Sequence, residues 1–335
     1  MRAAYVRTPN AADPVAALQI GEVETPEPPA GWVPVTVQAA SINHHDLWSL
    51  RGRAVHPDRL PMVLGTDAAG VTTDGQEVIV HAVIARPEWV GDETLDPQRT
   101  LLSEWYPGTM AEQVSVPPQN LVAKPAGLSF EEAACLPTAW LTAWRMLTQN
   151  AGLTEAGTVL VQGASGGVAT AAVILGHALG HRVWVTSRSR ESRELALARG
   201  AAAVFAPGDR VPERVDAVLE TVGEATWAHS VRALRPGGTL VICGATTGAN
   251  PPADLNRIFF QQLRVIGSTM GTRAQLAELA TFLIERGIRP PIDRVLGLDQ
   301  ADTALAAVAA GGLTGKVVLR LVTSQSAVRE PRSDR

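Results

Sequence analysis

The sequence is poor in cysteine. Its 335 residues include two, Cys135 and Cys243, which lie far apart in apolar runs. Two distant thiols cannot build a disulfide framework, and they cannot supply the ligands of a four-cysteine structural metal site.

The sequence also lacks a long hydrophobic run. No apolar stretch reaches membrane length, and the first residues, MRAAYVRTPN, have no apolar centre of the kind that a signal peptide needs. We therefore expect a cytoplasmic protein with no membrane partner.

No charge of one sign dominates. Lys and Arg number 29 against 33 Asp and Glu, which gives a formal net charge of -4. This balance argues against a nucleic-acid partner, and 46% hydrophobic residues argue against a disordered chain. No internal repeat is evident. The length predicts two domains, and the polar residues 324–335 are expected to form a flexible tail.

The first 125 residues show little helical periodicity. Proline and glycine separate short β-type runs at Val33–Ala39, Met62–Leu64, Glu77–Ala82 and Glu112–Val116. The pattern changes at Ser129, which predicts a helix N-cap because Glu131 and Glu132 follow it. A further helix is predicted at Thr138–Leu147.

From Thr158 onward, strands and helices alternate. A buried strand at Thr158–Gln162, a glycine-rich turn, a helix from Gly167 to Leu179 and a strand at Arg182–Thr186 form one βαβ unit. Further strands are predicted at Ala203–Phe205, Asp216–Leu219, Thr239–Cys243 and Val265–Gly267. The alternation predicts an α/β fold with a doubly wound parallel sheet. Helices at Arg273–Arg286 and Gln300–Ala309 and a strand at Lys316–Leu319 follow it.

The glycine-rich turn resembles a pyrophosphate-binding loop. Small residues there would let backbone N–H groups approach an anion at the helix N-terminus. The G-x-G-x-x-G pattern falls on Ala164-Ser165-Gly166-Gly167-Val168-Ala169, so alanine replaces two of its three glycines. An ordinary packed turn is the alternative, and the position between two buried strands favours the cofactor.

The end of the second strand of this unit indicates which nicotinamide cofactor binds. An NAD site would place Asp or Glu there, but the sequence has Ser187 and Arg188, and no carboxylate before Glu191. Hydroxyl and guanidinium groups suit a 2′-phosphate. We therefore predict NADPH, with Arg190 and Arg193 as further candidates; a solvated helix start is the alternative.

Six stretches together resemble the medium-chain dehydrogenase/reductase superfamily, and within it the zinc-independent quinone-oxidoreductase-like branch. They are SINHHDLWSLRG (41–52), LPMVLGTDAAGV (60–71), FEEAACLPTAWLTAWRML (130–147), VLVQGASGGVA (159–169), LRPGGTLVICGATTG (234–248) and LTGKVVLRL (313–321). The resemblance implies a β-rich, chaperonin-like catalytic domain from residues 1–125 and 270–323 and a Rossmann domain from 126–269. It also implies an active site between the domains and a homodimer.

The resemblance further implies where metal ligands would lie. The catalytic zinc places fall on Asn43, on Thr66 and Asp67, and near Thr138. Asn and Thr are poor ligands for Zn²⁺, and Asp67, which could coordinate, cannot hold zinc as a lone carboxylate. The segment 85–109, where the family's structural zinc would lie, has no cysteine. We therefore predict no metal at either site.

A metal at His44 and His45, with Asp46 or His81, is a rival interpretation. We disfavour it because adjacent side chains of a strand point to opposite faces. Asp46 is expected to bond nearby backbone groups.

Matched residue by residue, the resemblance implies further cofactor contacts at later strand ends and at a C-terminal glycine–lysine pair. These residues are Thr221, Val222, Cys243, Gly244, Ala245, Ser268, Thr269, Met270 and Lys316. The ammonium of Lys316 is expected to approach the cofactor phosphates. Each position also has an alternative as a turn or core residue.

Without zinc, the hypothesis is NADPH-dependent reduction of a quinone or an α,β-unsaturated carbonyl compound (an enone). Asn43, assisted by Thr138, is expected to bond the substrate carbonyl or the nicotinamide. The rival functions are a zinc-dependent alcohol dehydrogenase with atypical ligands and a non-catalytic NADPH-binding protein.

The proton donor stays open, because Trp48 occupies the place where related reductases carry a tyrosine. His44, His45, Tyr106 and water are the candidates. Trp48, Trp105 and Trp140 are expected to form either an apolar wall or ordinary core.

Overall fold

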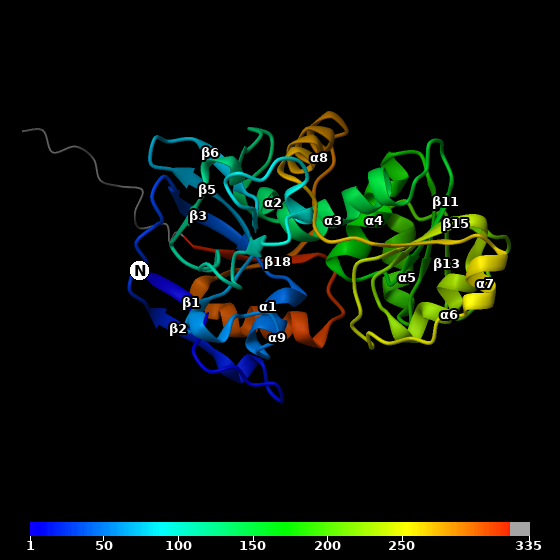
Figure 1. Ribbon diagram of the computed structural model, residues 1–335, viewed down its shortest axis with the longest axis horizontal. Coiled ribbons are helices and arrows are strands. Elements are labelled where there is room, and N and C mark those ends of the chain that lie inside the picture. The colour runs from blue at the N-terminus through cyan, green and yellow to red at the C-terminus, as the bar shows by residue number, and fades with distance from the viewer. Residues whose placement is uncertain (322–335) are drawn as a thin grey trace, which may run out of the picture.

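The computed structural model describes residues 1–321 and shows two bodies side by side (Figure 1). A β-rich body contains the N-terminal residues and the last strand, and an α/β body contains the middle of the chain. The tail predicted at 324–335 lies outside the described residues. Within them, no helix is long and apolar enough to cross a membrane.

The β-rich body is organised around a seven-stranded sheet to which both ends of the chain contribute. Its strands run in the order β10-β6-β5-β3-β18-β17, and β9 also pairs with β3. Their bounds are Leu121–Ala123, Glu77–Val80, Asp67–Thr72, Val33–Ser41, Lys316–Arg320 and Ile292–Gly297, with β9 at Gln113–Val116. Because β18 pairs antiparallel with β3, the C-terminal strand lies inside the N-terminal sheet.

Smaller elements complete this body. Strands β1 (Arg2–Val6), β2 (Leu18–Glu22) and β4 (Met62–Val63) form a second sheet, and β7 (Val83–Ile84) pairs with β8 (Thr100–Leu101). Helix α1 (His44–Leu50) packs against α9 (Ala301–Ala310). The predicted strands of this region are present, although β9 begins one residue later than expected.

The α/β body is a doubly wound parallel sheet, as predicted. Its order is β13-β12-β11-β14-β15-β16, and every neighbouring pair is parallel. The strands span Ala203–Phe205, Arg182–Thr186, Thr158–Gln162, Val215–Glu220, Leu234–Ile242 and Arg264–Gly267. Helices α4 (Gly167–Ala178), α5 (Arg190–Ala198), α6 (Glu224–Ala233) and α7 (Leu255–Phe260) connect them. In this order the central crevice at the strand ends is the place where nucleotides bind.

A buried helical run connects the two bodies. It comprises α2 (Phe130–Ala134), α3 (Leu141–Arg145) and two π-helical segments, Leu136–Trp140 and Met146–Asn150. The run extends beyond the predicted Thr138–Leu147 helix at both ends. It packs against α8 (Arg273–Glu285). Residues of this run and of both sheets share one hydrophobic core, so the bodies are fixed to each other by packing.

Candidate functional site

The glycine turn after β11 leaves open space at the N-terminus of α4. Gly163 has a positive φ of 91°, which favours glycine. Gly166 differs, because its φ is −70° and a Cβ there would meet no atom within 4 Å. The fold itself therefore does not require glycine at position 166. A ligand that approaches the backbone would require it, as a pyrophosphate at a helix N-terminus does.

Charged side chains at the end of β12 differ in their partners. Arg193 Nη1 donates to the carbonyl oxygen of Ser187 at 2.6 Å, and Arg190 pairs with Glu194. Arg188 is exposed, and no acidic side chain among residues 1–321 forms an ion pair with it. Its guanidinium is therefore available to an anion such as a 2′-phosphate.

Other predicted cofactor residues lie near the glycine turn or at neighbouring strand ends. A Cβ on Gly163 would lie 3.4 Å from Thr221 Oγ1 and 3.6 Å from Val222 Cγ2, and a Cβ on Gly244 would lie 2.6 Å from the oxygen of Thr221. Ser268 Oγ donates to Asn150 Oδ1 at 3.0 Å. Burial raises the pKa of the Cys243 thiol to about 12, so this residue stays protonated. The cofactor roles of these residues stay predictions.

The places matched to the catalytic zinc come together in space. Asn43 Nδ2 donates to Asp67 Oδ2 at 2.8 Å and to Thr66 Oγ1 at 3.3 Å. Thr66 Oγ1 lies 3.0 Å from Thr138 Oγ1. Lys316 Nζ donates to Asn43 Oδ1 at 2.5 Å and to the oxygen of Ile42 at 2.7 Å. The sequence argument found Lys316 but not this position for its ammonium.

These residues do not fit a zinc ion. Asp67 is the one carboxylate of the set, and the Lys316 ammonium, 3.7 Å from it, already supplies a positive charge. The amide of Asn43 presents its NH₂ group to Asp67, so it offers no lone pair on that side. Within residues 1–321, no group of three or more His, Cys, Asp and Glu side chains is arranged to hold a metal.

The expectation that His44 and His45 lie on a strand is wrong. They begin helix α1, because Asn43 is the N-cap and Asp46 Oδ2 accepts from the N–H of Asn43 at 2.8 Å. The histidines nevertheless separate: His45 Nε2 lies 2.9 Å from Glu104 Oε1, whereas His44 is exposed. His81 Nε2 lies 2.8 Å from the backbone oxygen of Gly271.

The two histidines have opposite pKa shifts. Surrounding protein lowers the pKa of His44, and the positive charges of Lys316 and Arg51 lower it further. Burial alone would lower the pKa of His45, but the hydrogen bond with Glu104 and the nearby carboxylates outweigh burial and raise it. His45 therefore keeps a proton to higher pH than an ordinary histidine does.

The segment 85–109 is ordered by carboxylates in place of cysteines. Asp96 accepts hydrogen bonds from the backbone N–H groups of Arg86 (2.8 Å) and Gln98 (2.9 Å). Asp92 binds Arg145 of α3, with 2.6 Å between Asp92 Oδ2 and Arg145 Nη2. These contacts order the loop and attach it to the buried helical run.

The three tryptophans do not form a common wall. Trp140 is 1% exposed and belongs to the core. Trp105 lies under the guanidinium of Arg59, whose Cζ atom is 3.8 Å from the centre of the indole ring. Trp48 is half-buried on α1. Tyr106 and Trp105 line a separate cavity of about 310 Å³ with Trp32. Of the two alternatives, ordinary core holds for Trp140.

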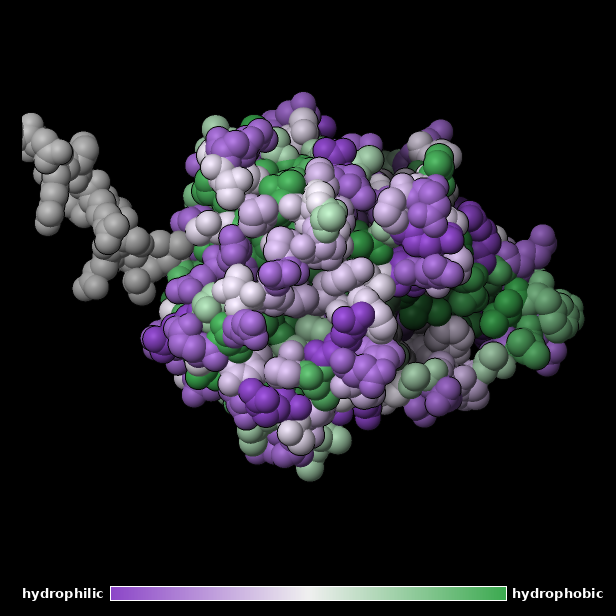
Figure 2. Space-filling model, turned by 60° about the vertical axis from the view of Figure 1, so that its left-hand side comes forward, coloured by the Kyte–Doolittle hydropathy of each residue, from purple (hydrophilic) through white to green (hydrophobic). Residues whose placement is uncertain are grey.

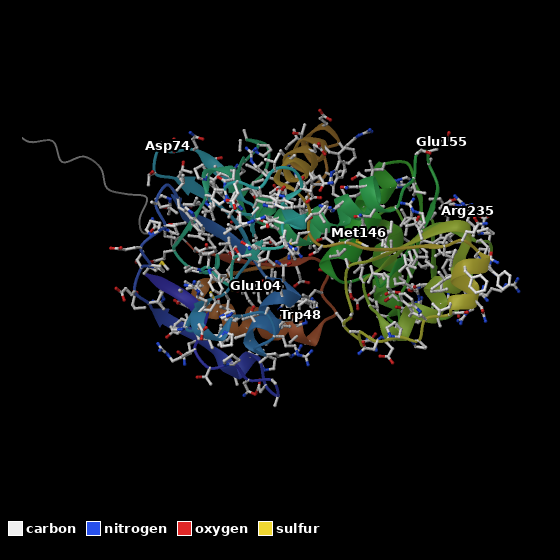
Figure 3. The ribbon with its side chains drawn as sticks, viewed as in Figure 1. Trp48, Asp74, Glu104, Met146, Glu155 and Arg235 are labelled. Carbon is white, nitrogen blue, oxygen red and sulfur yellow. The ribbon has the colours of Figure 1, made fainter. Side chains whose placement is uncertain are left out.

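A cavity of about 450 Å³ lies between the 85–109 segment and the chain that follows β16. It is lined by Val83, Thr94, Pro97, Arg99, Leu101, Glu104, Thr269 and Met270. Figure 3 shows Glu104 in the β-rich body, near Trp48 of α1. Sequence reasoning identified Thr269 and Met270 but missed Arg99 and Glu104, because loop residues carry no periodic signal.

Comparison with known proteins gives consistent matches. The family described as "Alcohol dehydrogenase GroES-like domain" matches residues 29–126, and "Zinc-binding dehydrogenase" matches 167–285. The chain is 30% identical to the probable acrylyl-CoA reductase AcuI of Escherichia coli, over 71% of this chain and 74% of that protein. It is 29% identical to a crotonyl-CoA carboxylase/reductase of Cereibacter sphaeroides, over 88% of this chain and 81% of that protein.

Solved structures agree with the fold. A crystal structure of an NAD-dependent alcohol dehydrogenase superposes with a TM-score of 0.88 at 30% identity, covering 96% of this chain and all (100%) of the other. The 2-octenoyl-CoA carboxylase reductase CinF in complex with NADP and 2-octenoyl-CoA superposes with a TM-score of 0.85 at 26% identity. The alignment with CinF covers 95% of this chain and 87% of that one.

Proposed function

Because the chain belongs to the medium-chain dehydrogenase/reductase superfamily, we propose that it is an NADPH-dependent reductase of α,β-unsaturated carbonyl compounds, with enoyl thioesters as the first substrate class to test. The observation that carries this proposal is the hydrogen-bonded set of Lys316, Asn43, Thr66 and Thr138 at the place of a catalytic zinc. An alcohol dehydrogenase needs a Lewis acid there. A reductase of conjugated C=C bonds needs a hydride donor and a group that stabilises charge on the carbonyl oxygen.

The reaction is balanced by one hydride and one proton. NADPH held at this edge of the sheet would supply a hydride to the β-carbon of the substrate. The π electrons of the C=C bond would then move onto the carbonyl oxygen and form an enolate. The enolate then takes a proton at the α-carbon, which leaves NADP⁺ and the saturated carbonyl compound.

NADPH binds along the carboxyl edge of the parallel sheet. The open space at Gly166 and the N-terminus of α4 suit the pyrophosphate. Ser187 and the unpaired Arg188 suit the 2′-phosphate. The relatives named for enoyl-CoA reduction and the NADP complex of CinF support the same cofactor.

The proton donor of this proposal is the pair of His45 and Glu104. Glu104 lines the 450 Å³ cavity next to Met270, and its carboxylate holds His45 in hydrogen-bond contact at 2.9 Å. Tyr106 packs on Trp32 in a different cavity, so it is displaced from this role. His44 and water are the alternative proton donors, and an unchanged kcat in Glu104→Gln would favour them.

The decisive experiment combines the purified protein with NADPH and a substrate panel. We expect oxidation of NADPH with crotonyl-CoA, 2-octenoyl-CoA or a simple enone, no ethanol oxidation with NADP⁺, and no stoichiometric zinc by elemental analysis. R188A should raise the Kd for NADPH by about 10- to 100-fold, because the variant loses one or two charge-assisted hydrogen bonds to the 2′-phosphate. Glu104→Gln should lower kcat and leave NADPH binding unchanged.

Other outcomes would redirect the assignment. Turnover of benzoquinone alone would place the activity among quinone reductases, and stoichiometric zinc with alcohol oxidation would restore the alcohol-dehydrogenase reading. Tight NADPH binding without turnover of any panel member would indicate a non-catalytic binding protein. Equal affinity for NADH and NADPH would overturn the cofactor assignment.

We further propose a homodimer that forms through the nucleotide-binding sheet. Strand β16 is an edge strand, with Val265 42% exposed, and α7 beside it exposes Leu255, Phe259 and Phe260 by 66%, 58% and 73%. Figure 2 shows apolar surface at the end of the molecule that carries α7 in Figure 1. An unpaired strand edge next to exposed aromatic rings favours pairing with a second copy.

A further inference from the structure

Lys316 has an unusual position for a lysine. The chain has two lysines, Lys124 and Lys316, among its 29 basic residues, and the Lys316 side chain is only 6% exposed. We propose that Lys316 fixes the direction of a hydrogen-bond chain through Asn43 and Thr66, and that this chain leaves the Thr138 hydroxyl as the donor to the substrate carbonyl oxygen. This inference rests on the proposed function and assigns the group that stabilises the enolate.

The first step is the orientation of the Asn43 amide. An ammonium group donates hydrogen bonds and accepts none, so Lys316 Nζ, 2.5 Å from Asn43 Oδ1, must face the amide oxygen. A flipped amide would place its NH₂ group against the ammonium and its oxygen against the Asp67 carboxylate. The NH₂ group therefore points to Asp67 and Thr66, and both of its hydrogens are used.

The second step is the orientation of the Thr66 hydroxyl. Thr66 is 1% exposed, and it accepts from Asn43, so its own proton needs an acceptor. The described residues offer one, Thr138 Oγ1 at 3.0 Å. The reverse direction would leave the Thr66 proton buried and unpaired, which costs about 1–3 kcal/mol. Thr66 therefore donates to Thr138, and Thr138 keeps its own proton for another acceptor.

The third step is the position of Thr138. This residue is half-buried, whereas its neighbours Pro137 and Ala139 are buried. A Cβ on Gly167, at the start of α4, would lie 3.0 Å from Ala139 Cβ and 3.3 Å from Lys316 Cδ. Thr138 thus stands beside the N-terminus of α4, where NADPH is expected, in a π-helical segment of the kind often found at functional sites.

The roles then divide between contact and position. Thr138 is the catalytic residue, because its hydroxyl contacts the oxygen on which charge develops during hydride transfer. Lys316 and Asn43 are positioning residues, and Asp67, which accepts from Ser41 Oγ at 2.8 Å, balances the buried ammonium. In this arrangement Asn43 has no spare donor, so its predicted contact with substrate runs through Thr66 and Thr138.

The test compares three threonine variants. T138V removes the hydroxyl at nearly constant volume, T138S keeps it, and T142V makes the same change one helical turn later, at a buried threonine outside the chain of hydrogen bonds. T138V should lower kcat by about 10²- to 10³-fold, the usual loss for one oxyanion donor. KM and NADPH affinity should stay near the wild-type values, and T138S and T142V should behave as wild type.

A spectroscopic readout separates catalysis from structure. 4-(Dimethylamino)cinnamaldehyde absorbs at longer wavelength when its carbonyl oxygen accepts a strong hydrogen bond. Wild type with NADP⁺ should shift this band, and T138V should bind the probe without the shift. K316M and K316Q should reduce the shift and kcat while NADPH affinity is unchanged; K316Q can still donate to Asn43 and so should lose less.

Several outcomes would overturn the inference. T138V with wild-type kcat and band shift would remove Thr138 from the reaction while the enone reductase stands. K316M and K316Q with weaker NADPH binding and an unchanged band shift would make Lys316 a phosphate contact. If wild type reduces no member of the panel, the proposed function fails by itself, and the band shift still tests the Thr138 contact independently.

Discussion

Gly163 and Gly166 lie three residues apart in one turn, yet different physical reasons account for them. Gly163 needs its positive φ of 91°, which most side chains disfavour. Gly166 has an extended conformation with a negative φ of −70°, and it has open space where a Cβ would be. The folded chain by itself would therefore accept a larger residue there. The glycine at 166 suits the N-cap of α4, and it leaves the space that a pyrophosphate at this helix N-terminus would need.

This difference predicts a clean separation of binding from stability. G166V should raise the Kd for NADPH at least about tenfold, because the side chain occupies the space needed by the pyrophosphate, and it should change Tm little. G21V is the matched control, because Gly21 has the same empty surroundings on strand β2, far from the turn. Isothermal titration and thermal unfolding check both variants; unchanged affinity in G166V would remove the cofactor from this turn.

At the scale of elements, helix α1 brings charged groups into the core. Asp46 is 0% exposed and accepts from the N–H of Asn43, but its Oδ1 has no partner among the described residues. Burial raises the pKa of Asp46 to about 6, although His45 and the Asn43 hydrogen bond lower it in part. The helix start that holds Asn43 and His45 in place thus contains a carboxyl that resists ionisation.

This raised pKa gives stability a defined pH dependence. The pKa of Asp46 in the folded protein, about 6, lies above the ordinary value of 3.8. Protonated Asp46 therefore contributes fully to the free energy of unfolding below pH 3.8, and this contribution is lost as pH rises through 6. The shift corresponds to a loss on the order of 3 kcal/mol. Urea unfolding from pH 4 to 8 should show the free energy of unfolding of wild type falling relative to D46N across this window. Parallel pH curves for the two proteins would contradict the prediction.

At the scale of the whole molecule, side-chain contacts between distant segments hold the two bodies together. Arg320 of β18 binds Glu131 of α2, and Ser268 bonds Asn150. Arg199, which follows α5, donates to the backbone oxygen of Thr314. The buried helical run adds apolar packing to these contacts.

The exposed apolar surface of α7 predicts the oligomeric state. Wild type should have twice the chain mass of 35.3 kDa by light scattering, and F260D should be monomeric with an unchanged circular dichroism spectrum. V90D is the control, because Val90 is 91% exposed at the opposite body. A monomeric wild type, or a dimeric F260D, would show that this surface is not the interface.

The sequence by itself located the strands of the parallel sheet, but it did not predict helix α1 or the strands β1, β2, β5 and β17. Alternating and continuous apolar runs located the strands, because side-chain periodicity is a local property of the chain. The strand at Ala203–Phe205 and the βαβ unit around the glycine turn lie where they were predicted. Asn and Thr at the places of Cys and His argued against zinc through ligand chemistry alone, without any knowledge of distances.

Only the tertiary structure decided which groups meet. Lys316 meets Asn43 across 273 positions, and His45 meets Glu104 across 59, and no local pattern encodes either contact. The expectation of a strand at His44 and His45 failed because Asn43 and Asp46 form a capping box that begins helix α1. The direction of the hydrogen bonds from Lys316 to Thr138 depends on donor–acceptor distances of 2.5 to 3.3 Å and on the burial of these side chains. Both arise only when strands and helices from distant parts of the chain pack together.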